Sequence, residues 1–174
     1  ISSMAKPVIA AINGTAAGGG FALALACDFR VMASTAILRQ GYTSSGLSMD
    51  GGATFTLPRL VGHARAMEIA AFDTNINAEQ ALQWGLATRI ADEESLMEEA
   101  DLLIEGILSN SANSFGWSKR LLNESFSTSM EQQMEKERAG LSHCADHEDG
   151  RQGIEAFLNK RPPVFKKRSG TSGE

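Results

Sequence analysis

The sequence predicts an α/β fold whose first half carries the strands and whose second half is helical. Three short segments, at 8–12, 28–32 and 36–39, have the length of strands, and the first of them is continuously apolar. A glycine-rich corner after the first run leads into an apolar helix. From about residue 93 onward, the apolar residues recur at helical spacing instead.

The first elements surround that corner. The run at 8–12 follows a proline and does not alternate in polarity, so we expect a strand that is buried on both faces. The segment 20–26 is almost wholly apolar, which predicts an interior helix. A stretch rich in glycine and serine follows the third strand and ends at Asp50, which we expect to cap a helix beginning at Gly51.

The remaining elements are read from periodicity and from helix-ending residues. Gly62 should interrupt a helix over 54–71, and Asn77 should cap a helix that stops at Gly85. A strand is predicted over 86–90. The helices expected after it cover 93–108, 113–126, 130–147 and 149–159, and the Pro162-Pro163 pair follows the last of them.

Composition excludes several classes of protein. The chain has 174 residues, 43% of them hydrophobic, which is enough for a real core. The net charge of −5, without a basic stripe, argues against nucleic-acid binding. There is no apolar run of membrane-spanning length and no signal peptide, so we expect a cytoplasmic protein that does not bind membranes. Cys27 and Cys144 are accordingly interpreted as reduced core residues.

The corner KPVIAAINGTAAGGG, residues 6–20, is the stretch around which the chain is organised. Its three consecutive glycines let a ligand approach the backbone where no Cβ is in the way. The first N–H groups of the following helix have no partner within the helix and favour negative charge. The corner can therefore hold a phosphate or a developing oxyanion, or it can simply be a place of close helix–strand packing.

Several motifs in sequence order resemble the crotonase (enoyl-CoA hydratase/isomerase) superfamily. They are KPVIAAINGTAAGGGFALALACDF, GLSMDGG, LPRLVG, INAEQALQWGLATRI and GRQGIEAFLNKRPP. The resemblance implies a spiral core of ββα units with a C-terminal helical trimerisation region. The chain resembles the C-terminal two-thirds of a member, with the core over 1–110, the helical region over 111–165 and a flexible tail over 166–174.

The family's substrates are acyl-CoA thioesters, and its shared chemistry is a thioester enolate held by two backbone N–H groups. The resemblance places Gly19 as one of these donors, while the other falls in a segment ahead of this sequence. It implies that Ala17, Gly18, Tyr42 and Gly46 line the substrate site. Coenzyme A is then part of the substrate, and no separate cofactor is expected.

The resemblance also narrows the reaction. Family hydratases use two glutamates, and here Ala22 and Tyr42 stand at their positions, so simple hydration is disfavoured. Asp50 matches the aspartate of two other branches, the phenylacetate-pathway and 3-enoyl-CoA isomerases and the 4-chlorobenzoyl-CoA dehalogenase. In an isomerase, Asp50 would move a proton from C2 to C4 of a 3-enoyl thioester. In a dehalogenase, it would attack the aromatic ring.

The resemblance further implies a homotrimer or hexamer, in which Phe157 and Lys160 reach the coenzyme A of a neighbouring subunit. A non-catalytic acyl-CoA-binding protein remains an alternative, because both hydratase acids are replaced. A nucleotide-binding domain is disfavoured, because no Lys-Ser/Thr pair follows the glycines. His143 and His147 are four residues apart but have no third ligand at a telling spacing, so no metal site is expected.

Overall fold

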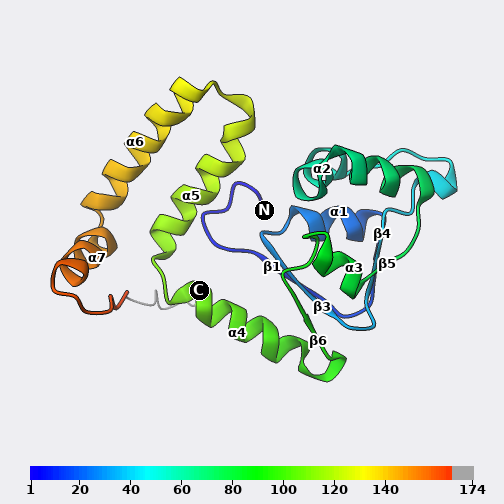
Figure 1. The fold of residues 1–174 in the computed structure, drawn as a ribbon, viewed down its shortest axis with the longest axis horizontal. Coiled ribbons are helices and arrows are strands. Elements are labelled where there is room, and N and C mark those ends of the chain that lie inside the picture. The colour runs from blue at the N-terminus through cyan, green and yellow to red at the C-terminus, as the bar shows by residue number, and fades with distance from the viewer. Residues whose placement is uncertain (166–174) are drawn as a thin grey trace, which may run out of the picture. The chain divides into compact units, whose positions relative to one another are not determined.

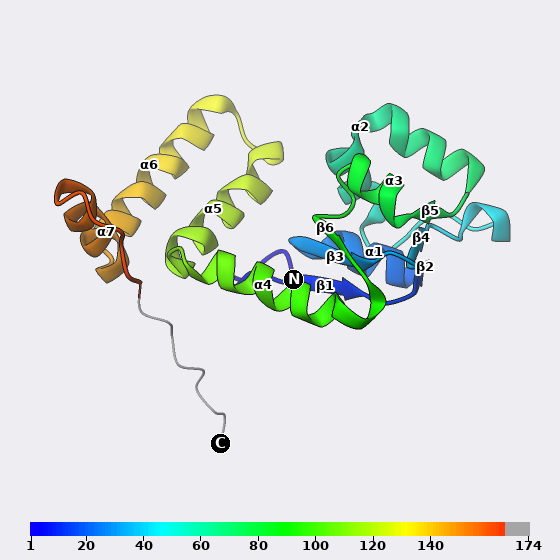
Figure 2. The same ribbon diagram turned by 60° about the horizontal axis from the view of Figure 1, so that its bottom comes forward.

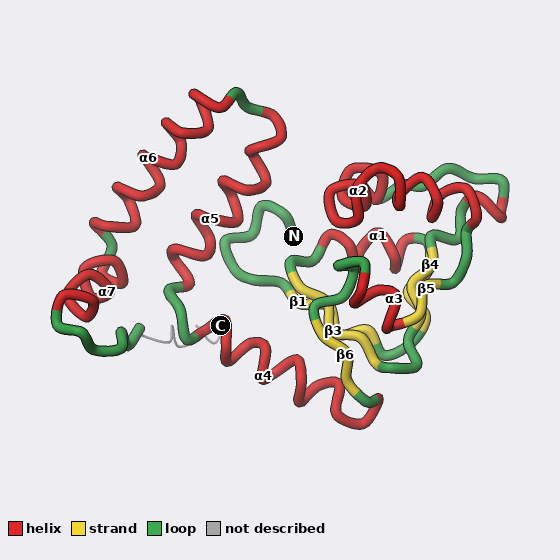
Figure 3. The backbone as a smooth tube through the Cα atoms, in the orientation of Figure 1, coloured by secondary structure: helices red, strands yellow, loops and turns green. Residues whose placement is uncertain are grey.

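The computed structural model describes residues 1–165, and the predicted tail over 166–174 lies outside them. The chain divides into two compact units. The first comprises Ile1 and Val8–Leu102, and the second comprises Ser2–Pro7 together with the chain from Leu103 onward. Within residues 1–165, the strands, which are yellow in Figure 3, all lie between residues 9 and 91 and so belong to the first unit.

The strands of the first unit form two small sheets. One sheet has the order β1-β3-β6, built from β1 (Ile9–Ile12), β3 (Phe29–Ala33) and β6 (Arg89–Ala91), and all of its pairs are parallel. The other has the order β2-β4-β5, built from β2 (Thr15–Ala17), β4 (Ile37–Arg39) and β5 (Ile76–Asn77). Its β2–β4 pair is parallel and its β4–β5 pair is antiparallel.

Helices pack against these strands to form the core. Helix α1 (Gly19–Ala26) lies beside α2 (Ala53–Phe72), and α3 (Ala78–Gln83) follows β5 (Figure 1). The core between them is dominated by fully buried apolar side chains, which include Phe21, Met32, Leu38, Leu57, Ile76 and Leu86. Gly62 has non-helical torsion angles inside α2, which confirms the predicted interruption. Asn77 forms a capping box with Gln80 at the start of α3, as the sequence predicted.

Three expectations about the strands and α1 need correction. Strand β1 is an edge of its sheet and Ala11 is exposed, so the strand is not buried on both faces among the described residues. An apolar groove of about 490 Å³ runs along this strand. Leu23 of α1 lines the groove and is 59% exposed, so α1 is not the wholly interior helix that was predicted. The final strand covers only Arg89–Ala91, and the three-residue strand β2 and the two-residue strand β5 were not predicted. Such short strands carry too few residues for a periodic signal.

Helix α4 (Leu96–Leu108) leads from the first unit into the second and buries Leu96, Ala100 and Leu103. A helical hairpin follows, formed by α5 (Ala112–Glu124) and α6 (Met130–Asp146), and α7 (Glu148–Leu158) packs at its end (Figure 2). Gly140 is the point of close approach in the hairpin, since a Cβ there would lie 3.2 Å from Trp117 and Leu121. Residues 2–7 run along α5, where the Lys119 ammonium donates to the carbonyl of Lys6.

Short 3₁₀ turns link some of these elements, at Thr43–Ser45, Glu93–Ser95 and Ser125–Ser127. Over residues 1–165, no helix is long and apolar enough to cross a membrane. Cys27 and Cys144 are free thiols, and both are half-buried rather than fully buried in the core.

Candidate active site

The glycine corner turns sharply from β2 into α1. Gly18 has φ 56°, a left-handed value that favours glycine, and its N–H donates to the carbonyl of Arg39 at 3.2 Å. Helix α1 then begins at Gly19 without any side-chain cap. Within residues 1–165, the Gly19 N–H donates no hydrogen bond, and no atom lies within 4 Å of the position of a Cβ there. This amide is therefore open to an oxyanion at a helix N-terminus.

Asp50 does not cap α2, which corrects the prediction. The helix begins at Ala53, its N-cap is Gly52 in a left-handed conformation, and no side chain caps it. Asp50 contributes only its carbonyl, which accepts from the N–H of Ala53 at 3.0 Å. Its carboxylate is instead occupied by the Tyr42 hydroxyl, which donates to Asp50 Oδ1.

This hydrogen bond brings together two residues that the resemblance had placed in the site. The Tyr42 ring in turn faces the glycine corner, since a Cβ on Gly18 would lie 4.0 Å from its Cζ and its hydroxyl oxygen. The bond to the Asp50 carboxylate is the largest cause of a raised pKa of Tyr42, and loss of solvent adds to it. The phenol thus remains a neutral donor in the ordinary pH range.

Ala22, in the first turn of α1, supports the segment that carries Asp50. The side chain is buried, and a Cβ on Gly51 would approach the Ala22 Cβ to 2.8 Å. Gly51 also has φ 60°, so this position favours glycine on two grounds. A larger side chain at either position would displace the backbone next to Asp50.

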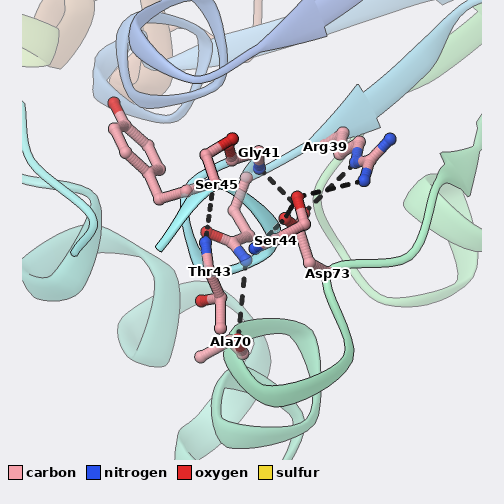
Figure 4. A network of polar contacts seen from close by, with 9 residues as sticks. Arg39, Gly41, Thr43, Ser44, Ser45, Ala70 and Asp73 are labelled. Atoms are coloured by element: carbon pink, nitrogen blue, oxygen red, sulfur yellow. Dashed lines mark hydrogen bonds and ion pairs between the residues drawn. The ribbon is translucent and has the colours of Figure 1, made fainter. Parts of the chain in front are cut away.

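A buried carboxylate holds the loop that carries Tyr42. Asp73, at the C-terminal end of α2, accepts from the N–H of Gly41 at 2.8 Å, from the N–H of Ser44 at 3.0 Å and from the Ser44 hydroxyl. Arg39 completes the network with a 3.3 Å ion pair (Figure 4). Burial raises the pKa of Asp73, but the hydrogen bonds from Ser44, Gly41 and Arg39 outweigh it and lower this pKa to about 2.

Gln40 fixes the same loop from the other side. Its side chain is fully buried, and its Oε1 accepts from the N–H of Tyr42 at 3.0 Å. Its amide nitrogen donates to the carbonyl of Ala70 in α2 at 3.5 Å. Figure 4 shows Ser44 beside Asp73 and Thr43 near Ala70. The backbone at Tyr42 is therefore held by two buried side chains.

Neither Asp73 nor Gln40 was predicted from the sequence to be a site residue. The signal available for Asp73 was weak, because a single acid after a helix is common at the protein surface. Gln40 follows a short apolar strand and looks like the start of a solvated loop. Their role depends on a contact across about 30 residues of chain, which no local pattern reveals.

The other predicted residues are distributed over both units. Ala17 and Gly46 lie in the first unit, at the end of β2 and after the Thr43–Ser45 turn. Phe157 lies in the last turn of α7 and is 81% exposed, and Lys160 follows that helix with φ 51°. Both of these belong to the second unit. Their roles in substrate binding stay predictions.

The two spaced histidines have structural contacts. His143 of α6 packs against Trp117 with ring centroids 4.9 Å apart. His147 caps α7 by accepting from the N–H of Asp149 at 3.1 Å. Among residues 1–165, no group of three or more His, Cys, Asp or Glu side chains is arranged to hold a metal ion.

Chemically, the first unit offers an open backbone donor and an exposed carboxylate around one glycine corner. The donor can stabilise negative charge that develops on an oxygen, and the carboxylate can accept a proton. Tyr42 joins them, because its hydroxyl binds the carboxylate while its ring faces the corner.

Comparison with known proteins identifies the family of this chain. A family model described as enoyl-CoA hydratase/isomerase matches residues 1–168. Among curated proteins, the chain is 35% identical over 165 residues to 1,2-epoxyphenylacetyl-CoA isomerase of Escherichia coli. It is 38% identical over 165 residues to crotonyl-CoA hydratase of Syntrophomonas wolfei. Each match covers 95% of this chain, and 63% and 64% of the respective relative.

A solved structure gives the same picture. The enoyl-CoA hydratase from Polaromonas sp. JS666 superimposes with a TM-score of 0.88 at 38% identity. The alignment covers 95% of this chain and 65% of that one. The fold is thus the crotonase fold predicted from the motifs, and the chain spans just under two-thirds of the length of these relatives.

Proposed function

We propose that this chain, which belongs to the enoyl-CoA hydratase/isomerase family, is part of an acyl-CoA isomerase that moves a double bond from the 3-enoyl to the 2-enoyl position. One observation carries the proposal: the Asp50 carboxylate is held by Tyr42, whose ring faces the glycine corner. The family resemblance adds that Ala22 and Tyr42 stand at the positions of the hydratase glutamates, and neither side chain is a carboxylate. Relatives of similar identity are named as an isomerase and as a hydratase, so the site residues carry the distinction.

The proposed reaction needs one carboxylate. Asp50 removes a proton from C2 of the 3-enoyl thioester, and the electron pair of the C–H bond moves into the thioester to give a dienolate. The negative charge falls on the thioester oxygen, where the Gly19 N–H donates a hydrogen bond. Asp50 then returns the proton to C4, and the dienolate collapses to the conjugated 2-enoyl product. Atoms and charge balance without a cofactor.

The test compares the full-length protein with its Asp50→Asn variant. Conversion of a 3-enoyl-CoA is followed by the ultraviolet absorbance of the conjugated thioester. We expect kcat to fall by roughly 1,000-fold or more, because an amide cannot accept the proton. A variant as active as the wild type would overturn the isomerase mechanism. A wild type that binds the thioester without converting it would favour the non-catalytic alternative.

The second unit supports a further part of the proposal, a homotrimeric or hexameric assembly. Three large apolar side chains of α6 are exposed, with Met130 at 74%, Met134 at 60% and Leu141 at 72%. Large exposed apolar patches commonly mark protein–protein interfaces. In such an assembly, the exposed Phe157 and Lys160 are proposed to contact the coenzyme A bound by a neighbouring subunit.

A further inference from the structure

We infer that Tyr42 is a positioning residue, whose hydroxyl fixes the Asp50 carboxylate in the orientation that proton transfer requires. The inference rests on the proposed function, because it assigns Tyr42 a role in the reaction of Asp50. It goes beyond that proposal by giving a task to a residue that the resemblance identified only as part of the substrate site. The main evidence for it is the hydrogen bond that the Tyr42 hydroxyl donates to Asp50 Oδ1.

Asp50 has few other restraints on its orientation. The residue is exposed, it lies in an irregular segment, and its neighbour Gly51 has left-handed torsion angles. An exposed carboxylate on such a segment samples several rotamers, and each non-productive rotamer lowers the rate. The Tyr42 hydroxyl occupies one carboxylate oxygen and leaves Oδ2 to accept a proton.

Tyr42 is itself well held, as a positioning residue must be. Its backbone N–H is bound by the buried Gln40 side chain, and the adjacent Gly41 N–H is bound by the buried Asp73 carboxylate. The ring faces Gly18, where a Cβ would lie 4.0 Å from the Tyr42 Cζ and hydroxyl oxygen. Asp73, at the C-terminal end of α2, thus holds the loop over 41–45, and Tyr42 of that loop holds the Asp50 carboxylate.

The raised pKa of Tyr42 offers a readout that does not depend on activity. Since the bond to Asp50 is the main cause of the shift, removing the carboxylate should let the phenol ionise at lower pH. Ionisation of tyrosine is followed by its phenolate absorbance near 295 nm. Subtracting the titration of a Tyr42→Phe variant isolates the signal of this residue in a full-length protein of any tyrosine content.

The experiment therefore has a spectroscopic arm and a kinetic arm. In the first, the Tyr42 phenol is titrated in the wild-type protein and in Asp50→Asn. We expect its midpoint at lower pH in the variant. A midpoint that is unchanged would show that the contact does not form in solution and would overturn the inference, whatever reaction the protein catalyses.

The kinetic arm compares Tyr42→Phe with Tyr42→Ala. Tyr42→Phe keeps the ring over Gly18 and removes only the donor, so we expect kcat to fall about 10-fold while KM stays within about threefold, as for a lost hydrogen bond to a charged group. Tyr42→Ala should lose at least as much of kcat. If Tyr42→Phe keeps wild-type kcat and only Tyr42→Ala is impaired, the ring acts by packing alone and the inference is overturned.

The two arms separate failure of the inference from failure of the proposed function. If Asp50→Asn retains full isomerase activity, the proposed mechanism is wrong. Tyr42 then has no role in proton transfer either. If Asp50→Asn is inactive but Tyr42→Phe behaves as the wild type, Asp50 remains the proton carrier and only the positioning role is overturned. If Asp50→Asn is inactive and Tyr42→Phe loses kcat alone, the inference is supported.

Discussion

At the scale of single residues, Asp73 contributes most to the order of the candidate site. Its buried carboxylate accepts from two backbone N–H groups, one hydroxyl and one guanidinium, and this satisfies the negative charge. Hydrogen bonds to a charged acceptor are worth more than neutral ones. The loop over 41–45 therefore depends on a residue that lies about 30 positions further along the chain.

This dependence predicts how stability varies with pH. The pKa of Asp73 is about 2 in the folded protein and near its ordinary value in the unfolded chain, so folding favours the ionised form. Its stabilisation is fully present above about pH 4 and is lost as the pH falls toward about 2. In Asp73→Asn, the loss of stability between about pH 4 and about pH 2 that Asp73 causes should be absent. Asp101→Asn removes an exposed acid of α4, and its stability should vary with pH as that of the wild type does.

The measurement is a series of urea-unfolding curves between pH 2 and 7. At neutral pH we expect Asp73→Asn to be less stable by on the order of 2 kcal/mol, because its amide cannot replace the charge-assisted bonds. The stability difference should shrink as the pH falls. A difference that is constant over the whole range would show that the charge of Asp73 does not contribute.

Gly51 is a second residue at which the structure makes a sharp prediction. A methyl group in Gly51→Ala would collide with the Ala22 Cβ at 2.8 Å and would occupy left-handed torsion angles. We expect a stability loss of about 1–2 kcal/mol and a lower kcat, since the backbone next to Asp50 must shift. Gly14→Ala is a matched control for the added methyl group, because nothing lies within 4 Å of a Cβ there and its φ is not left-handed. Equal stabilities for the two variants would contradict the packing argument.

At the scale of elements, the sequence was informative where local chemistry decides the structure. The glycine corner, the interruption at Gly62 and the cap at Asn77 all depend on residues within a few positions of one another. The prediction that Asp50 caps α2 was wrong, because Gly51 and Gly52 adopt left-handed conformations and turn the chain before α2 starts. The pairing of β2 with β4 and the Asp73 network join distant segments, so no sequence window contains them.

The capping box of α3 predicts that Asn77 contributes to the stability of the protein. The Asn77 side chain accepts from the N–H of Gln80 at 2.8 Å, and the Gln80 side chain returns a bond to the N–H of Asn77 at 3.2 Å. Asn77→Ala should cost about 1 kcal/mol in the free energy of unfolding. Gln83→Ala, at an exposed position of the same helix, should change it by less than about 0.5 kcal/mol. Indistinguishable unfolding midpoints for the two variants would argue against the cap.

At the scale of the whole molecule, the burial of apolar side chains bears on assembly. Most of the buried apolar core lies in the first unit, around its strands. Both units expose some large apolar side chains, and in the second unit these include Met130, Met134 and Leu141 of α6. The proposed assembly would cover these side chains. The sequence predicted a helix over 130–147 but not the exposure of its apolar side chains, because an amphipathic pattern does not distinguish an intramolecular contact from an intermolecular one.

The assembly is tested by sedimentation of the full-length protein. We expect a trimer or a hexamer for the wild type and smaller species for a Met134→Asp, Leu141→Asp double variant, since two charges would be placed in an apolar contact. Ser142→Asp adds a charge at an exposed polar position of the same helix and should leave the assembly intact. A wild type that sediments as a monomer at micromolar concentration would refute the proposed assembly.

The edge strand β1 has a consequence for how this chain behaves as an isolated polypeptide. Its sequence, IAAI, has no charged residue and no proline, which are the usual features that keep strand edges from pairing with other chains. The apolar groove beside it offers a further surface to a second extended segment. Solutions of residues 1–174 alone should therefore be prone to intermolecular β-pairing and aggregation, and a lysine at the exposed Ala11 is the substitution best placed to suppress them.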